Sequence, residues 1–232
     1  MKTGTLTADT QSLAKVVSIE SQNPSSYVSA AFQQFVLAGC HSLIQFEENG
    51  KCSAIGDPLD KVALQFSQWR YNQTSDCYFR TETETESGSP QISKPFRLWQ
   101  LRSFPFDPSL RLSSAIVLLQ LEDSRLQLWK LTKGSPDTMI KLLRKDSSLF
   151  DSHFKNQTQE LEMQGYRSIA LGAENLANTS IFQNLFPHGL SADAETLAKA
   201  RRKGELIRRN AVDTFSNNDR SEEHTSELQS RQ

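Results

Sequence analysis

Two cysteines and a histidine are the side chains of this sequence whose types suit metal binding. Cys40 and His41 are adjacent and Cys52 follows them, while the remaining cysteine, Cys77, stands apart. Zinc ligands usually come in two closely spaced pairs, and the sequence offers no second pair. An odd number of cysteines without a Cys-x-x-Cys spacing is typical of reduced thiols in a cytosolic protein. The sequence therefore predicts no metal site.

A basic run between Lys199 and Arg209 raises the question of nucleic-acid binding. The run has no interleaved aromatic residues, and the formal net charge of the whole chain is −1. The surrounding segment, Asp193–Asn210, is also rich in good helix formers. We therefore expect a solvated helix face here and no nucleic-acid partner.

The apolar content is typical of a globular chain with one core, since 37% of the residues are hydrophobic and 23% are charged. The longest apolar run, Ala115–Leu121, is interrupted by Gln120 and is far shorter than the roughly 20 residues of a membrane-spanning helix. We therefore expect no direct membrane insertion of this chain.

Hydrophobic periodicity predicts helices around one sheet. A strand is expected at 13–19, a helix at Tyr27–His41 and another helix after Asp57-Pro58, each with its apolar side chains in the core. Polar, low-complexity residues predict an exposed loop at 72–95. Strands are then expected at Phe96–Phe106, Ser114–Leu121 and Arg125–Lys133, followed by helices at Thr138–Leu143 and Asp151–Gln164. A strand at Tyr166–Gly172 and the basic helix at Asp193–Asn210 complete the expected elements. The pattern predicts an α/β fold of the α+β type, with a mainly antiparallel sheet flanked by helices.

The expected strands carry apolar side chains that need a common layer. Among them are Phe104, Leu118, Leu128 and Ile169. Because strands of one sheet share their buried face, we expect all four side chains to be buried in a single core within residues 9–215.

The string Lys2-Thr3-Gly4-Thr5-Leu6-Thr7 is the most specific motif of the chain. It matches the right-hand part of Asp-Lys-Thr-Gly-Thr-Leu-Thr, the signature around the phosphorylated aspartate of P-type ATPases, and so resembles that family. Met1 stands where the aspartate would be. The resemblance implies that residues 1–8 are a stub of the HAD-like phosphorylation domain, with Lys2, Thr3, Gly4 and Thr5 as motif residues. No catalytic residue is then expected in this chain.

Four further blocks follow in the order of one domain of that family. They are Gly56–Asp60 (GDPLD), Phe104–Phe106 (FPF), Lys133–Asp137 (KGSPD) and Gly165–Leu171 (GYRSIAL). Their succession resembles the nucleotide-binding domain of type V P-type ATPases, most of all the branch that contains the endoplasmic-reticulum transmembrane-helix dislocase. The resemblance implies a nucleotide-binding domain at residues 9–215. It would lie on the cytosolic face of a membrane, the endoplasmic reticulum, with the actuator, phosphorylation and membrane domains of the parent as partners.

The resemblance also implies a purine pocket. Phe106 would stack on the adenine ring, although the residue type alone favours an ordinary core aromatic. Lys133 would lie at the floor of the pocket, or else be an ordinary lysine at a hairpin end. Gly134 would let the backbone approach the nucleotide, and Asp60 would lie near the adenine amino group.

Two arginines are implied at the phosphates of the same ligand. Arg167 would donate to them as a fork, or else be a solvated arginine at a strand end. Arg111 would replace a lysine that the family uses there. The run after Phe106 departs from the family, since an acid is gained at Asp107 and an arginine is lost at Leu112. An acid facing the triphosphate would weaken binding.

The parent enzyme is expected to use ATP with Mg²⁺ and to form an aspartyl phosphate. By resemblance it couples this chemistry to the transport or extraction of transmembrane helices. A polyamine-exporting type V ATPase is the alternative within the family. An unrelated soluble interaction domain is the alternative of a different class.

The C-terminal string RSEEHTSELQS at Arg220–Ser230 looks like the in-frame translation of a sequencing-library adapter. Its polar composition has no apolar periodicity and gives it no drive to pack. We therefore expect residues 220–232 to be an artefact tail and exclude them from the fold.

Overall fold

The computed structural model describes residues 12–16, 30–48, 51–80, 95–142, 148–177 and 179–204. The chain divides into two compact units, Met1–Ala177 and Asn178–Gln232. The expected stub at 1–8 and the tail from Arg220 lie outside the described residues, as do residues 81–94 of the expected loop.

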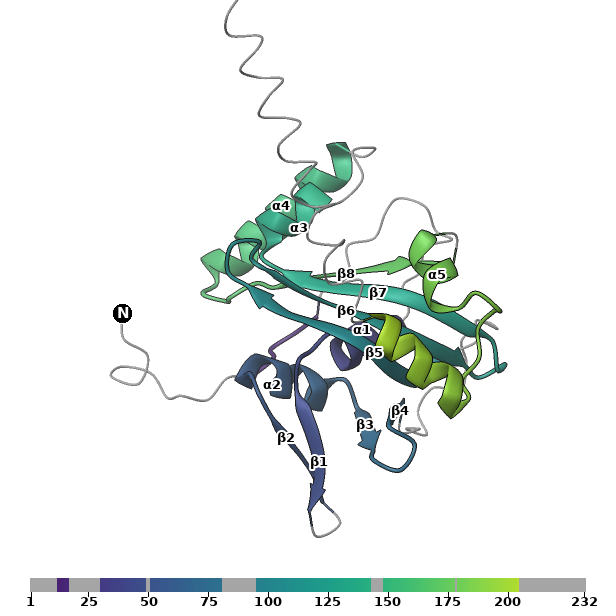
Figure 1. Ribbon diagram of the computed structural model, residues 1–232. Coiled ribbons are helices and arrows are strands. Elements are labelled where there is room, and N and C mark those ends of the chain that lie inside the picture. The colour runs from purple at the N-terminus through teal and green to yellow at the C-terminus, as the bar shows by residue number, and fades with distance from the viewer. Residues whose placement is uncertain are drawn as a thin grey trace, which may run out of the picture. The chain divides into compact units, whose positions relative to one another are not determined.

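A six-stranded sheet is the centre of the first unit (Figure 1). Its strand order is β3-β4-β5-β6-β7-β8, and every neighbouring pair is antiparallel. The strands are β3 (Trp69–Asn72), β4 (Cys77–Arg80), β5 (Pro95–Asp107), β6 (Leu112–Leu121), β7 (Leu126–Gly134) and β8 (Ala170–Asn175). The antiparallel sheet flanked by helices confirms the expected mixed α/β class. The three long strands β5, β6 and β7 also confirm the sequence-based prediction, with a tight turn at Glu122–Ser124 between the last two.

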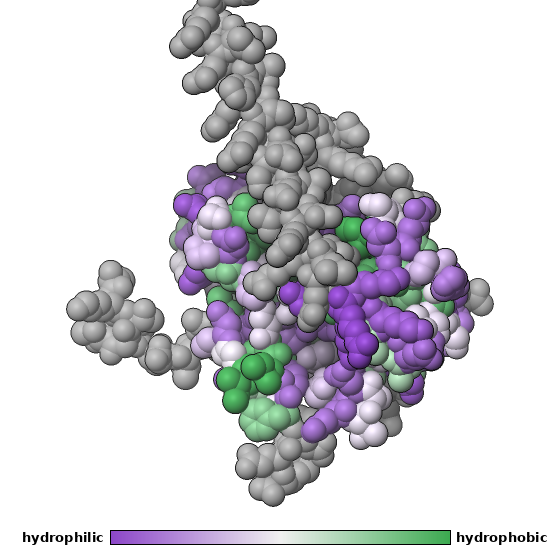
Figure 2. All heavy atoms as spheres, viewed as in Figure 1, coloured by the Kyte–Doolittle hydropathy of each residue, from purple (hydrophilic) through white to green (hydrophobic). Residues whose placement is uncertain are grey.

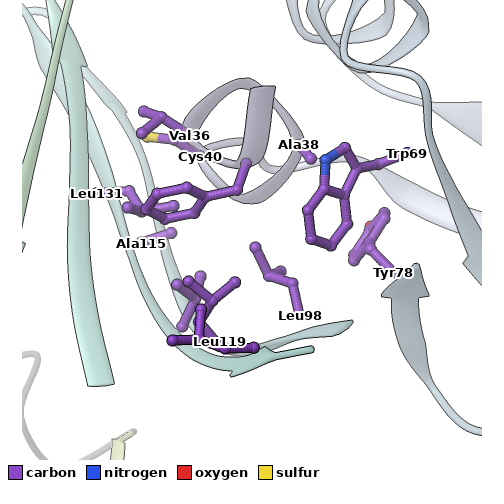
Figure 3. Close-up of a cluster of buried hydrophobic side chains, with 12 residues drawn as sticks. Val36, Ala38, Cys40, Trp69, Tyr78, Leu98, Ala115, Leu119 and Leu131 are labelled. Carbon is purple, nitrogen blue, oxygen red and sulfur yellow. The ribbon is translucent and has the colours of Figure 1, made fainter. Parts of the chain in front are cut away.

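Helix α1 (Ala30–Gly39) packs against this sheet and supplies much of its core. Phe35, Val36 and Cys40 belong to one buried cluster with side chains of β5, β6 and β7. Figure 3 shows Val36 and Cys40 in this cluster near Leu131 and Ala115. A Cβ atom at Gly39 would lie 2.6 Å from Leu131 Cδ1. The lack of a side chain at Gly39 therefore lets the helix end approach the sheet closely. The buried face expected for this helix is confirmed at Phe35, Val36 and Cys40.

Helix α2 (Pro58–Phe66) begins where the sequence predicts, with Asp57 as its N-cap and Pro58 in its first turn. It follows a separate hairpin of β1 (Ile44–Glu48) and β2 (Lys51–Ile55). Ile44 and Ile55 are paired across this hairpin, and both are exposed. Figure 2 shows a green apolar cluster over the region of α2 and the hairpin on an otherwise largely hydrophilic face.

Two further helices complete the first unit, α3 (Pro136–Leu142) against β7 and β8, and α4 (Ser148–Met163) against α3. The second unit contains α5 (Ser180–Leu185), capped by Thr179, and a helical segment at 194–204. Asp193 caps that segment, because its Oδ1 accepts a hydrogen bond of 2.8 Å from the backbone N–H of Thr196. The expected basic helix is thus confirmed over its described part.

Several expectations about short elements are wrong. Residues 13–16 form no strand, and 17–19 lie outside the described residues. The expected loop at 72–95 contains β4, and β8 begins only at Ala170. The hairpin β1–β2 and helix α5 were not expected.

Some expected core positions are also wrong. Leu118 and Leu128 are fully buried, but Ile169 is 43% exposed because it precedes β8 instead of lying within it. Phe104 is only half-buried. On α2 the buried residue is Asp60, whereas Phe66 is 42% exposed and Trp69 lies on β3.

Candidate functional site

Four strands end or begin at the same edge of the sheet. The cross-strand pairs there are Asp107 with Leu112, Leu112 with Gly134, and Gly134 with Ala170. We call the edge formed by these four residues the Gly134 edge. The sequence-predicted residues Phe106, Arg111, Lys133 and Gly134 lie at it or next to it. Arg167 lies in the stretch that leads into Ala170.

Phe106 is presented outward by an irregularity in β5. The pairing of β5 with β6 shifts register between Phe104 and Asp107, and such a bulge re-aims the side chains of the strand that carries it. Pro105 lies inside the irregular stretch, where the loss of a ladder hydrogen bond is tolerated. As a result Phe106 is 61% exposed, so the core position suggested by its residue type is wrong.

Asp107 organises the turn that follows. Its Oδ1 accepts hydrogen bonds from the backbone N–H of Ser109 (2.8 Å) and from Ser109 Oγ (2.6 Å). These bonds lower the pKa of Asp107 below its usual value. The backbone N–H of Arg111 donates to the Asp107 carbonyl at 2.7 Å, and Arg111 has a left-handed φ of 53°. The extra acid noted in the sequence is thus engaged within its own turn, next to the exposed Arg111.

Gly134 is needed for the close approach of β6 and β7. A Cβ atom there would lie 2.8 Å from the carbonyl oxygen of Arg111 and 3.1 Å from Leu112 Cβ. The backbone N–H of Ser135 donates to the same Arg111 carbonyl at 3.2 Å. The structure therefore gives Gly134 a role between strands, in addition to the expected contact with a nucleotide.

Lys133 forms an ion pair with Asp60, which connects the end of β7 to the first turn of α2. The other oxygen of Asp60, Oδ2, accepts a hydrogen bond of 3.1 Å from the backbone N–H of Ser42. The two side chains are unequally exposed, 20% for Lys133 and 7% for Asp60. An acid in the first turn of a helix also interacts favourably with the helix dipole. The structure thus brings these two predicted residues into direct contact.

Cys40 and His41 lie beneath this ion pair as buried, neutral groups. Burial raises the pKa of Cys40 to about 12, and the thiol faces the carbonyl of Ser113 at 3.8 Å. Burial, and then the charge of Lys133, lowers the pKa of His41 to about 4. His41 Nδ1 accepts a hydrogen bond from the backbone N–H of Leu43, and the ring lies edge-on to Tyr78. No residue pattern around His41 predicts this packing role.

The metal-binding alternative concerned Cys40, His41 and Cys52. Cys40 and His41 directly follow α1, whereas Cys52 lies on β2 opposite Glu47. Among the described residues, no group of three or more histidine, cysteine, aspartate or glutamate side chains is arranged to hold a metal ion.

The structure gives less information on the remaining predicted site residues. Lys2, Thr3, Gly4 and Thr5 lie outside the described residues. Arg167 is exposed and precedes Ala170 by three residues in the chain. A shallow cavity of about 210 Å³ lies at the opposite end of β5, lined by Asn72, Ser75, Cys77, Phe79, Phe96 and Arg97. None of the residues expected to bind a nucleotide lines this cavity.

Comparison with known proteins gives two distant relatives, and no family model matches the chain. A probable cation-transporting ATPase, catp-6, of Caenorhabditis elegans is 29% identical over 146 residues, which cover 60% of this chain and 11% of the relative. A probable manganese-transporting ATPase, PDR2, of Arabidopsis thaliana is 28% identical over 184 residues, which cover 78% of this chain and 14% of the relative. The matched regions are therefore a small part of those proteins. Within the described residues, no helix is both long and apolar enough to cross a membrane. These similarities support a distant relationship of the chain to the P-type cation-transporting ATPases.

Proposed function

We propose that residues 9–215 are the ATP-binding domain of a P-type ATPase. The observation that carries this proposal is the meeting of Phe106, Arg111, Lys133 and Gly134 at one edge of the sheet, although they come from two different strands and a turn. Asp60 reaches the same edge through its ion pair with Lys133. Residues from motifs that do not belong to one site would be expected at scattered positions in the fold.

The chemistry of this edge suits a purine nucleotide. The exposed ring of Phe106 offers a face for base stacking. Lys133 supplies a cation that is partly withdrawn from solvent. Arg111 is an exposed arginine next to the same edge, and the exposed Arg167 precedes Ala170 of that edge by three residues. Guanidinium groups bind phosphate oxygens through paired donors. Mg²⁺ and the phosphorylated aspartate would be supplied by the phosphorylation domain of the parent enzyme.

For the parent we propose a type V P-type ATPase on the cytosolic face of the endoplasmic reticulum, with transmembrane helices as its cargo. This part of the proposal rests on the sequence blocks GDPLD, FPF and KGSPD. The names of the two relatives describe cation and manganese transport by those proteins. No observation on the described residues favours polyamine export or an unrelated interaction domain.

Titration of ATP into the chain tests the nucleotide-binding proposal. We expect saturable binding that is weakened by Phe106→Ala and by Arg111→Gln. Phe96→Ala and Arg125→Gln are matched controls, because Phe96 is an exposed aromatic at the other end of β5 and Arg125 lies beside the hairpin turn at the other end of the sheet. Equal effects of the site variants and the controls, or no binding by the wild type, would overturn the proposal.

A further inference from the structure

Asp60 has both of its carboxylate oxygens engaged by the protein. Oδ1 pairs with Lys133 Nζ, and Oδ2 accepts from the backbone N–H of Ser42. The whole residue is only 5% exposed. A carboxylate that binds a base amino group would need a free, accessible oxygen in the plane of the base. Lys133, the more exposed partner of the pair, is better placed to meet a ligand.

Three elements fix this carboxylate in place. Asp60 sits in the first turn of α2, which contains Pro58 and is capped by Asp57. Asp57 Oδ1 accepts a hydrogen bond of 2.7 Å from the backbone N–H of Leu59. The Ser42 bond ties it to the segment after α1, and Lys133 ties it to the end of β7. The lysine side chain is long and flexible, with a strongly hydrated ammonium group. The fixed, buried carboxylate of Asp60 therefore holds the ammonium group of Lys133 in one position.

We propose that Asp60 is a positioning residue, which acts on the nucleotide through Lys133 and does not itself contact the base. This inference rests on the proposed nucleotide site and deepens it. It replaces the expectation that Asp60 lies near the adenine amino group. The base would then contact the cationic Lys133 instead of a carboxylate. The site would therefore not select for the amino group of adenine.

A comparison of two nucleotides separates positioning from contact. ATP and purine riboside triphosphate differ only in the exocyclic amino group. If Asp60 acts through Lys133, Asp60→Asn should weaken both ligands by the same factor, about threefold to fivefold. A loss for ATP that is much larger than the loss for the analogue would show a direct contact and overturn the inference.

A double variant tests whether the effect passes through Lys133. Asp60→Asn with Lys133→Met should bind ATP no more weakly than Lys133→Met alone, because the lysine that Asp60 positions is already absent. Additive losses would contradict the inference. Asp57→Asn is the matched control, since asparagine keeps the helix cap while a nearby acid is removed. It should leave binding within about twofold of the wild type.

The final experiment needs no nucleotide. Lys133 is titrated by NMR of its side-chain nitrogen in the wild type, Asp60→Asn and Asp57→Asn. The charged or titratable groups around it are Asp60 and Asp57 at the start of α2, and Cys40 and His41 after α1. Removing the paired carboxylate while burial remains should lower the pKa of Lys133 by roughly one unit or more, and by more than Asp57→Asn does.

The outcomes of these experiments are distinct. An unchanged pKa of Lys133 in folded Asp60→Asn would overturn the positioning role, whether or not ATP binds. Absence of ATP binding by the wild type would overturn the proposed function. If Asp60→Asn alone fails to fold, recovery of folding in Asp60→Asn with Lys133→Met would show that an unpaired Lys133 is the cause, as the inference requires.

Discussion

Phe106 and Lys133 differ in what they can offer a nucleotide. An aromatic stack on a base is worth roughly 1–3 kcal/mol by alanine substitution, whereas a partly exposed charge contact commonly contributes less than about 1 kcal/mol. Lys133 also has a counter-ion in Asp60, so much of its charge is already compensated. We therefore expect Phe106→Ala to weaken ATP binding more than Lys133→Gln, as measured by calorimetric titration.

Both variants must remain folded for that comparison to count. Circular dichroism and thermal melting against the wild type give the control. Lys133→Gln leaves the buried Asp60 without its cation, so it is the variant that we expect to lose more stability. Unchanged ATP affinity in a folded Phe106→Ala variant would show that Phe106 is only a surface residue.

His41 makes the stability of the first unit sensitive to acid. Its pKa is about 4 in the folded chain, against an ordinary value of 6.5. Between these values the unfolded chain binds a proton that the folded chain does not, so stability falls as the pH drops from about 6.5 to about 4. The loss is at most about 3 kcal/mol, at 1.36 kcal/mol per pKa unit.

The variant His41→Asn should flatten this pH dependence, because asparagine keeps an acceptor for the Leu43 N–H but does not titrate. Urea unfolding at pH 7 and pH 4.5 measures the difference. His188→Asn, at an exposed position of the second unit, is the control. An equally steep loss of stability in His41→Asn would exclude His41 as the cause.

At the scale of elements, the approach of β6 to β7 depends on the absence of a side chain at Gly134. In Gly134→Ala the added Cβ would meet backbone at 2.8 Å, and backbone in a sheet moves only at a cost. We expect a destabilisation of about 1–3 kcal/mol in urea unfolding, together with weaker ATP binding, because Arg111 belongs to the displaced turn.

Gly172→Ala is the matched control on the neighbouring strand. The added Cβ would also meet an atom at 2.8 Å, but that atom is the terminal methyl group of Met139, which can move aside. We expect this variant to lose clearly less stability than Gly134→Ala. Equal losses would mean that the backbone contact at Gly134 is not the decisive one.

Long elements with a strong pattern were predictable from the sequence, and short ones were not. The strands β5, β6 and β7 are nine residues long or more, and apolar side chains on the buried face of the sheet decide their structure. The hairpins β1–β2 and β3–β4 use strands of five and four residues. Such strands form because tertiary neighbours pair with them, and local propensity carries little of that information.

The candidate site shows the same division. Motif order assigned Phe106, Lys133 and Asp60 to one expected site, but it did not predict the ion pair between Asp60 and Lys133. Burial of Asp60 is set by its pairing with a residue far away in the chain, which periodicity on α2 cannot reveal. The outward position of Phe106 depends on a bulge, and its residue type alone pointed to the core.

At the scale of the whole molecule, the chain corresponds to a small part of its two relatives. It matches 11% and 14% of the length of its two relatives. In the proposed nucleotide site, the described residues offer ATP stacking on Phe106 and contacts to the phosphates.

We therefore expect this chain to bind ATP weakly and to hydrolyse none. Rate acceleration requires groups that stabilise the transition state, and a site that only holds the ground state supplies none of them. The expected dissociation constant is on the order of millimolar, about −4 kcal/mol of binding free energy. Calorimetric titration measures the affinity, and phosphate release against a buffer control measures the hydrolysis. Phosphate release that persists through further purification and is lost in Phe106→Ala would contradict this prediction, because it would show a complete active site in this chain.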